Sequence, residues 1–282
     1  MTDRASPRTP VENAELAVLL EVAGTPKPGN VDRRRDHPDL RFEHFLAGAV
    51  GARRGLALAP DRPVGEAFER AVEGMSHQRG GNTQFGALLV LVPLVRAAAG
   101  GDLTPAGVER VVADTTVEDA VSFYRAFEHV DVAVGDPPAG LDELDVRRGS
   151  AVEPTLRDRA LTLGDVMALS ADVDGVAAEW TDGFERTFAA AEWLLADEGP
   201  VGDRASHAFL RLLAAEVDTF VVKTADEERA SEATRRAQAV LDGEADAEEL
   251  AAEFVERGIN PGTTADLTAG ALFVALERGL DV

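Results

Sequence analysis

The sequence contains no cysteine, and only two of its 28 Lys and Arg residues are lysines, Lys27 and Lys223. The absence of cysteine excludes disulfides, thiolate catalysis and cysteine-bound zinc. Lysine differs from arginine because its ammonium group is compact and strongly hydrated, which suits phosphate binding. We therefore expect the two lysines to occupy sites where arginine cannot replace them, although chance retention is a competing interpretation.

Long apolar runs are also missing. No stretch approaches the roughly 18–20 apolar residues that a membrane-spanning helix requires. The N-terminal stretch MTDRASPRTP has no apolar segment behind its charges, so it is not typical of a signal peptide. These features predict a cytoplasmic protein that has no membrane partner.

Positive charge is scarce as well. The chain has 51 Asp and Glu residues against 28 Lys and Arg residues, which gives a formal net charge of −23. Such a surface repels nucleic acids, so we expect none as a partner. The acidity and the near replacement of lysine by arginine suggest a halophile, because concentrated salt screens self-repulsion.

Alternating strand patterns are nearly absent, whereas apolar residues recur at helical spacing along most of the chain. The sequence therefore predicts an all-α fold, a single compact multi-helix domain over residues 1–282, with a possible flexible connection at 135–150. For the apolar run 87–99, a strand is the alternative in the first half. Helices are expected over residues 11–23, 40–59, 63–76, 87–99, 104–130, 162–170, 175–196, 203–222, 225–241, 245–257 and 264–278.

Three breaks in the helical pattern, and a fourth segment near a helix end, concentrate unusual polar residues, and loops on a rigid scaffold are where binding sites are often built. We expect these four segments to meet in space and to line one cationic cleft. They are segment 1 (25–39, TPKPGNVDRRRDHPD), segment 2 (80–86, GGNTQFG), segment 3 (216–226, EVDTFVVKTAD) and segment 4 (260–266, NPGTTAD).

Segment 1 holds Lys27 between two prolines, which restrict the backbone and present the ammonium with little flexibility to lose. Asn30, Asp32, Asp36 and Asp39 supply oxygens of the kind that Mg²⁺ accepts. The arginines at 33–35 could meet phosphates or simply pair with neighbouring carboxylates.

Segments 2 and 4 each place glycine and small hydroxyl residues just before an expected helix. Backbone N–H groups and the positive end of the helix would then face an anion. Neither segment fits the Walker pattern, and each taken singly is more typical of a helix N-cap turn than of a phosphate cradle. Their occurrence together with two isolated lysines favours binding of nucleotide phosphates.

The four segments resemble motifs of one family, the triphosphoribosyl-dephospho-coenzyme A synthases. TPKPGNVDRRRDHPDLRFEHF is similar to the family's opening signature TPKPG-x-VD…H-x-D…F, and GGNTQFGALLVL is similar to G-x-NTHKGAIF. DTFVVKTAD lies where the family has an Asp-Thr stretch followed by a basic residue. NPGTTADLTAGALF is similar to N-PG-xx-ADLLA, so the ordered resemblance runs from about residue 21 to residue 273.

The resemblance implies an all-helical transferase that moves the 5-triphosphoribosyl group of ATP to the 2′-hydroxyl of 3′-dephospho-CoA and releases adenine. It implies small-molecule nucleotide substrates and Mg²⁺, and leaves a homo-oligomer open. The implied catalytic carboxylates are Asp32, Asp39, Asp218 and Asp266, the first two also as metal ligands. The implied nucleotide- and phosphate-binding residues are Lys27, Asn30, His37, Asn82, Thr83, Gln84, Lys223, Asn260 and Gly262.

The chain departs from the family pattern in segment 2, where Gln84 and Phe85 replace a His-Lys pair. Glutamine cannot act as an acid or base near neutral pH, so this replacement bears on the acceptor more than on the fold. Two alternatives therefore stay open. One is a related nucleotide-using enzyme of another cofactor pathway, and the other is a non-catalytic nucleotide-binding helical module.

Overall fold

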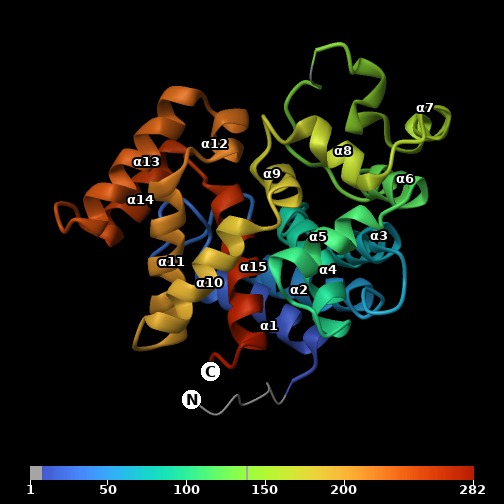
Figure 1. Cartoon of the computed structure of the whole chain (residues 1–282). Coiled ribbons are helices and arrows are strands. Elements are labelled where there is room, and N and C mark those ends of the chain that lie inside the picture. The colour runs from blue at the N-terminus through green and yellow to red at the C-terminus, as the bar shows by residue number, and fades with distance from the viewer. Residues whose placement is uncertain (1–7, 138) are drawn as a thin grey trace.

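The computed structural model describes residues 8–137 and 139–282 and shows a helical protein (Figure 1). These residues form fifteen α-helices and two short 3₁₀ helices, and no strand, which confirms the prediction of an all-α fold. The elements are α1 (Pro10–Ala23), α2 (Phe42–Leu56), α3 (Val64–Met75), α4 (Phe85–Ala99), α5 (Pro105–Ala113), α6 (Val117–Ala126), η1 (Asp142–Leu144), η2 (Val146–Val152), α7 (Glu153–Arg159), α8 (Leu163–Ser170), α9 (Gly175–Thr181), α10 (Glu185–Ala196), α11 (Val201–Ala215), α12 (Thr219–Thr224), α13 (Glu227–Leu241), α14 (Ala247–Arg257) and α15 (Gly262–Glu277).

Side-chain caps explain where several helices begin. Thr9, Thr116 and Thr162 each accept a hydrogen bond from the N–H three residues later, and the carboxylate of that later residue bonds back to the cap. The cap at Thr116 also explains a difference from the prediction. The single helix expected over 104–130 is two helices, α5 and α6, because Thr116 starts a second one.

Two other expected helices are also divided. The pattern over 175–196 breaks between α9 and α10, where Gly183 and Phe184 adopt φ angles of 64° and 62°. Residues in this left-handed region end a helix because the next N–H no longer reaches the preceding turn. The pattern over 203–222 breaks at the extended residue Glu216, so that α12 starts separately from α11.

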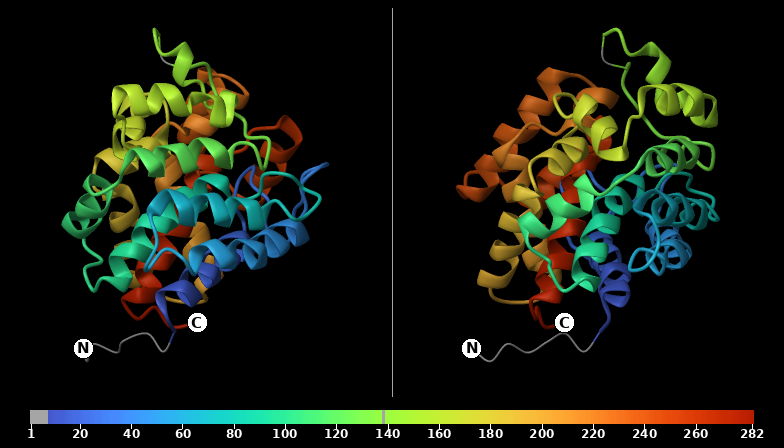
Figure 2. Two further views of the ribbon diagram at one scale, coloured as in Figure 1. Left: turned by 90° about the vertical axis from the view of Figure 1, so that its right-hand side faces the viewer. Right: turned by 45° about the vertical axis from the view of Figure 1, so that its right-hand side comes forward.

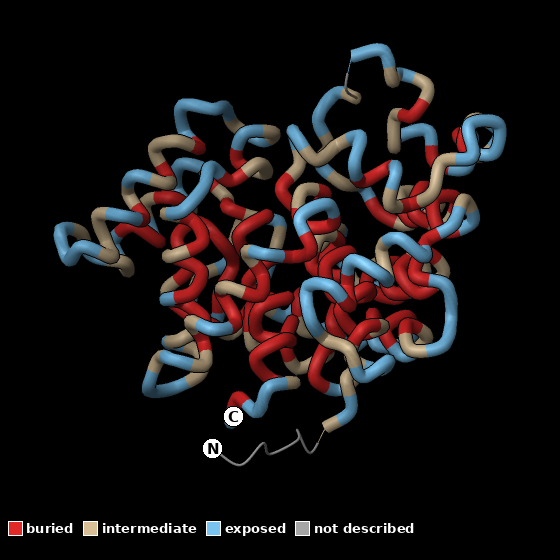
Figure 3. Tube along the Cα trace, viewed as in Figure 1, coloured by how far each residue is buried: buried red, intermediate tan, exposed pale blue. Residues whose placement is uncertain are grey.

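Helix α15 runs through the middle of the molecule, with every residue from 267 to 276 buried (Figure 3). Helices α1 and α4 pack against one side of it, and α10 and α11 pack against the other (Figure 1). Helix α4 is apolar almost all round and helical throughout, so the strand alternative for its first half is wrong. None of the described helices is both long and apolar enough to cross a membrane.

The outer helices add a layer on each side of this centre. Helix α3 packs between α2 and α6, and it also contacts α4 (Figure 2). On the other side, α11, α13 and α14 share an apolar cluster that includes Phe209, Ala233 and Phe254. The two groups of outer helices together cover α15, and the N-terminal end of α15 lies between these two groups.

The connection predicted at 135–150 contains η1 and most of η2. Tyr124 of α6 donates a hydrogen bond from its hydroxyl to the carbonyl oxygen of Leu144, at 2.7 Å, which holds this stretch against α6. Pro138 within the connection lies outside the described residues. So do residues 1–7, which hold most of the N-terminal stretch discussed above.

Candidate functional site

Segment 4 forms the first turn of α15, and segment 1 contacts it across 230 residues of sequence. The side-chain amide of Asn30 donates a hydrogen bond to Oδ1 of Asn260, at 3.0 Å. The neighbouring Gly29 has a φ of 75° and lies so close to the carbonyl of Ile259 that a Cβ atom would overlap it. Only glycine fits both the conformation and the space at this junction.

Segment 2 contacts segment 4 through the carboxylate of Asp266. The backbone N–H of Ala87, in the first turn of α4, donates a hydrogen bond to this carboxylate. Gly86 lies directly against it, and a Cβ atom at this position would overlap Oδ2. The start of α4 is thereby held against a side chain of α15, with a carboxyl group at the positive end of α4.

Segment 3 contacts segment 4 through Asp218. One carboxylate oxygen of Asp218 accepts hydrogen bonds from the N–H groups of Phe220 and Val221, at 2.9 and 3.1 Å. The other accepts from the N–H and the hydroxyl of Thr264, at 2.8 and 2.7 Å. Burial raises the pKa of Asp218, and these hydrogen bonds oppose the rise. Asp218 therefore caps α12 and α15 together and is fully engaged by protein donors.

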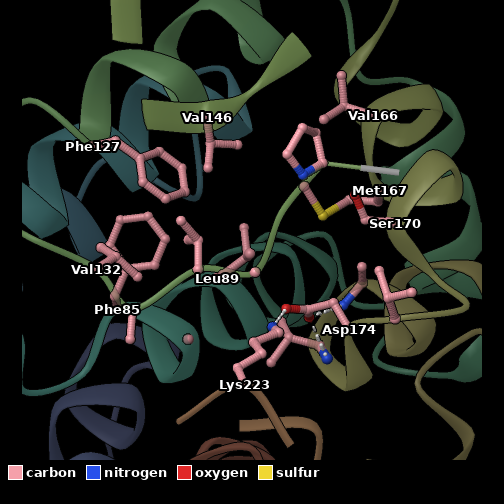
Figure 4. A pocket seen from close by; sticks show the side chains of 18 of the residues that line it. Phe85, Leu89, Phe127, Val132, Val146, Val166, Met167, Ser170, Asp174 and Lys223 are labelled. Carbon is pink, nitrogen blue, oxygen red and sulfur yellow. Dashed lines mark hydrogen bonds and ion pairs between the residues drawn. The ribbon is translucent and has the colours of Figure 1, made fainter. Parts of the chain in front are cut away.

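A cavity of about 410 Å³ opens beside this junction (Figure 4). Its lining comes from α4, α6, α8, α9, α12, α15 and the stretch that follows α6. Its polar lining residues include Asn82, Asp174, Lys223, Thr263 and Asp266. Most of the remaining lining is apolar and includes Phe85, Leu89, Phe127, Val132, Val146, Val166 and Met167. Segments 2, 3 and 4 each contribute to the lining.

Lys223 lies in the last turn of α12, and its ammonium forms an ion pair with Oδ2 of Asp174 (Figure 4). The other oxygen of Asp174 accepts hydrogen bonds from the N–H groups of Val176 and Ala177, both at 2.9 Å, and so caps α9. Among the described residues that line the cavity, Lys223 is the one basic side chain. A phosphate group entering the cavity therefore meets a cation that already has a partner.

Asp266 occupies the cavity beside this pair. Its pKa lies well above the usual range because protein surrounds it and because the carboxylates of Glu21, Asp218 and Asp174 lie nearby. The hydrogen bond from Ala87 acts in the opposite direction. Such a carboxyl keeps its proton to a higher pH than an ordinary aspartate, and it can donate that proton to a ligand.

Lys27 is fully buried and does not line the cavity. Its ammonium forms an ion pair with Glu21 of α1, and it lies 3.4 Å from Oδ1 of Asn30. Burial raises the pKa of Glu21, whereas Lys27 acts in the opposite direction. Of the two lysines, Lys223 lines the cavity. Lys27 is buried next to the contact between segments 1 and 4 and helps to hold it.

Asp32 is also fully buried, and it organises segment 1. Its carboxylate accepts hydrogen bonds from the hydroxyl of Thr25 at 2.8 Å and the N–H of Lys27 at 3.3 Å. The N–H of Arg34 donates to it at 2.8 Å, and the guanidinium of Arg35 does so at 3.2 Å. These donors occupy the oxygens that a metal ion would need.

Residues 33–39, at the end of segment 1, are exposed or half-buried. Asp39 is exposed, and Nε2 of His37 lies 2.9 Å from the carbonyl oxygen of Gly29. In the described part of the chain, no group of three or more His, Cys, Asp or Glu side chains is arranged to hold a metal ion. A magnesium site at Asp32 and Asp39 therefore stays a prediction, and the described residues do not provide a preformed site.

Segment 2 divides its side chains between two faces. Asn82 lines the cavity and accepts a hydrogen bond from the N–H of Phe85, at 3.0 Å. Gln84 is buried on the other face, where its amide donates to the carbonyl oxygen of Phe45 at 3.0 Å. The hydroxyl of Thr83 donates to Gln84, at 3.2 Å, and lies outside the cavity lining.

Phe85 occupies the position of the lysine in the related motif, and it forms part of the cavity wall (Figure 4). Its ring packs against Phe127, with centroids 4.7 Å apart, and against Phe68 at 5.0 Å. The wall is therefore aromatic where the motif would place a cation. In segment 4, Asn260 and Gly262 pack at the junction itself and do not line the cavity.

Asp174 is the site residue that the sequence did not reveal. It directly precedes Gly175, and an aspartate before a helix is an ordinary N-cap. In a chain with 51 acidic residues, an aspartate directly before a helix does not by itself indicate a functional residue. The apolar wall was equally hidden, because Phe127, Val132 and Val146 follow no motif and come together through folding alone.

The comparisons agree with the resemblance of the four segments. A family model described as CitG, ATP:dephospho-CoA triphosphoribosyl transferase, matches residues 7–281. A crystal structure from Archaeoglobus fulgidus, whose protein carries a provisional assignment as a triphosphoribosyl-dephospho-CoA synthase, is similar with a TM-score of 0.68. The two chains are 28% identical, and the match covers 85% of this chain and 99% of the other. No curated protein matches the chain significantly.

Proposed function

Because the chain belongs to the CitG family of ATP:dephospho-CoA triphosphoribosyl transferases, we propose that the cavity beside the start of α15 binds its ATP and dephospho-CoA. One observation carries this proposal: three of the four motif-like segments line a single cavity, and the fourth supports their junction. The cavity lining includes a carboxyl of raised pKa, Asp266, and a lysine, Lys223, and group transfer from a nucleotide can use both.

The proposed reaction breaks the bond between adenine and the ribose of ATP, and joins that ribose carbon to the 2′-hydroxyl oxygen of the acceptor. Adenine gains one proton and the hydroxyl loses one, so no other reactant is needed. Asp266 is the proposed proton donor, because its raised pKa favours the protonated form. The carboxylate left behind can stabilise positive charge on the ribose and then take the hydroxyl proton.

The cavity lining contains apolar regions that suit a purine ring and the pantetheine arm of dephospho-CoA. The aromatic and aliphatic wall around Phe85 and Phe127 suits a purine ring, since bases stack readily on aromatic side chains. Leu169, Val173 and Val222 are 39%, 54% and 38% exposed, and all three line the same cavity. We call these three residues the apolar rim, and we assign to it the uncharged pantetheine arm of dephospho-CoA.

The phosphates face a less favourable lining. Lys223 is the basic lining residue, whereas Asp136, Asp145, Asp174 and Asp266 contribute carboxyl groups. A triphosphate therefore needs further positive charge, which Mg²⁺ arriving with ATP would supply. The described residues do not form a metal cluster of their own, so we assign no protein ligands to that ion.

The aromatic wall also favours a second candidate, a related transferase that uses another acceptor. Phe85 removes a cation from the wall, and an acceptor with fewer phosphates than dephospho-CoA would tolerate this change better. Both candidates share the ATP half of the reaction, and they differ in the molecule that receives the triphosphoribosyl group.

Adenine release tests the proposal directly. We expect the purified protein, incubated in concentrated salt with ATP, Mg²⁺ and 3′-dephospho-CoA, to release adenine in amounts equal to a triphosphoribosylated product identified by mass. Adenine release that requires a different acceptor would support the second candidate. Stabilisation by ATP without any turnover would contradict both and indicate a nucleotide-binding module.

A further inference from the structure

The two oxygens of Asp174 have separate partners. Oδ1 accepts the hydrogen bonds from the N–H groups of Val176 and Ala177 and fixes the start of α9. Oδ2 forms the ion pair with the ammonium of Lys223. The Lys223 side chain can therefore leave the pair while Asp174 remains anchored as a helix cap.

The pair is accessible from the cavity. Lys223 is 17% exposed and Asp174 is 32% exposed, and both side chains line the cavity (Figure 4). An ion pair in this position is only partly desolvated, so the free energy that holds it together is modest. A triphosphate carries several negative charges and can outcompete a single carboxylate for the ammonium.

We propose that Asp174 is a displaceable counter-ion, which holds Lys223 in the free enzyme and releases it to the triphosphate of the nucleotide. This inference rests on the proposed function of the cavity. Asp174 thereby sets how tightly polyphosphate binds, because each binding event must first break the pair. It also keeps the lone cation of the described lining from attracting unrelated anions.

Asp174→Asn is the variant that separates the two roles. The amide oxygen of asparagine can still cap α9, since asparagine is as good an N-cap as aspartate. The negative charge opposite Lys223 is lost. We expect inorganic tripolyphosphate, titrated calorimetrically with a chelator present to exclude metal ions, to bind this variant about tenfold more tightly than the wild type.

Two control variants test the two effects of Asp174→Asn separately: the change at a helix cap and the loss of a carboxylate from the cavity lining. Asp246 caps α14 through hydrogen bonds of 2.9 Å from Glu248 and Glu249, the same geometry as at Asp174, and Asp246→Asn should leave tripolyphosphate binding unchanged. Asp136→Asn removes a carboxylate from the cavity lining without touching Lys223, and its effect should stay below about twofold.

A double variant decides whether Asp174 acts through Lys223. In a Lys223→Met background, Asp174→Asn should no longer strengthen tripolyphosphate binding, because the cation that it releases is absent. An equal gain with and without the lysine would overturn the proposal and reduce Asp174 to a general source of repulsion. Unchanged or weaker binding by Asp174→Asn alone would also overturn it. The readout is binding, so these results stand apart from whether adenine is released.

Discussion

At the scale of single residues, Lys27 and Glu21 form a buried ion pair behind the junction. Removing one partner of such a pair leaves an uncompensated charge, which typically costs about 3–5 kcal/mol. We therefore expect Lys27→Met to lower the free energy of unfolding by about this amount. Urea denaturation followed by circular dichroism measures it.

The matched control is Arg62→Met, which removes an exposed ion pair with Glu66. Exposed pairs contribute at most about 1 kcal/mol, so this variant should remain close to the wild type. Equal losses in the two variants would show that burial of Lys27 does not matter. Whether Lys27 also contacts phosphate stays a prediction, which the affinity of a folded Lys27 variant for ATP can test.

Asp266 gives a prediction about pH. Its pKa is raised in the folded protein, so the native state binds this proton more tightly than the unfolded chain does. The resulting stabilisation is complete below the ordinary pKa of 3.8 and is lost as the pH rises through the raised value. Asp266→Asn carries no such proton, so its stability should fall less between pH 4 and 8 and exceed that of the wild type at neutral pH.

Thermal unfolding over this pH range measures the effect, and adenine release should fall in the same variant. Asp39→Asn is the control, because Asp39 is exposed and its replacement should leave the pH dependence as it is in the wild type. Parallel stability curves for Asp266→Asn and the wild type would contradict the account of Asp266.

At the scale of elements, the sequence predicted what depends on local spacing. Apolar periodicity located α1, α4 and α15 to within two residues at each end, because α1 buries a continuous face and α4 and α15 are buried almost all round. The breaks before α6 and α10 were missed, since the same periodicity continues across them. Thr116 and the Gly183–Phe184 turn interrupt the helices for reasons of capping and backbone conformation.

The junction could be predicted only through the resemblance of its segments to one family. Asn30 and Asn260 are 230 residues apart, and no local pattern states that they share a hydrogen bond. Apolar periodicity likewise does not predict whether a lysine lies inside or outside a cavity. Lys27 and Lys223 looked equivalent in sequence, and packing makes one a buried support and the other a cavity residue.

The apolar rim, at the end of α8, the turn into α9 and the face of α12, gives a prediction about the acceptor. Leu169→Asp places a charge where we assign the uncharged pantetheine arm, so KM for dephospho-CoA should rise about tenfold with KM for ATP unchanged. Steady-state kinetics of adenine release measure both constants.

Val50→Asp is the control for this change, because Val50 is 62% exposed on α2 and does not line the cavity. Its kinetics should match those of the wild type. A rise in KM for ATP alone, or no change in either constant, would show that the rim does not bind the acceptor.

At the scale of the whole molecule, the net charge of −23 makes the folded protein repel itself. The screening length falls from about 10 Å at 0.1 M salt to about 3 Å at 1 M, so concentrated salt should relieve this repulsion. We expect the melting temperature in KCl to rise by several degrees or more over this range. A constant or falling melting temperature would contradict the inference of a halophilic surface.

The central claim is that the cavity at the start of α15 is the catalytic centre, and Lys223→Met tests it most directly. Adenine released from ATP in the presence of dephospho-CoA should fall at least a hundredfold in this variant, because the described lining then holds no basic residue for the triphosphate. Circular dichroism should confirm that the variant is folded. Adenine release at the wild-type rate by folded Lys223→Met would place the chemistry elsewhere in the molecule.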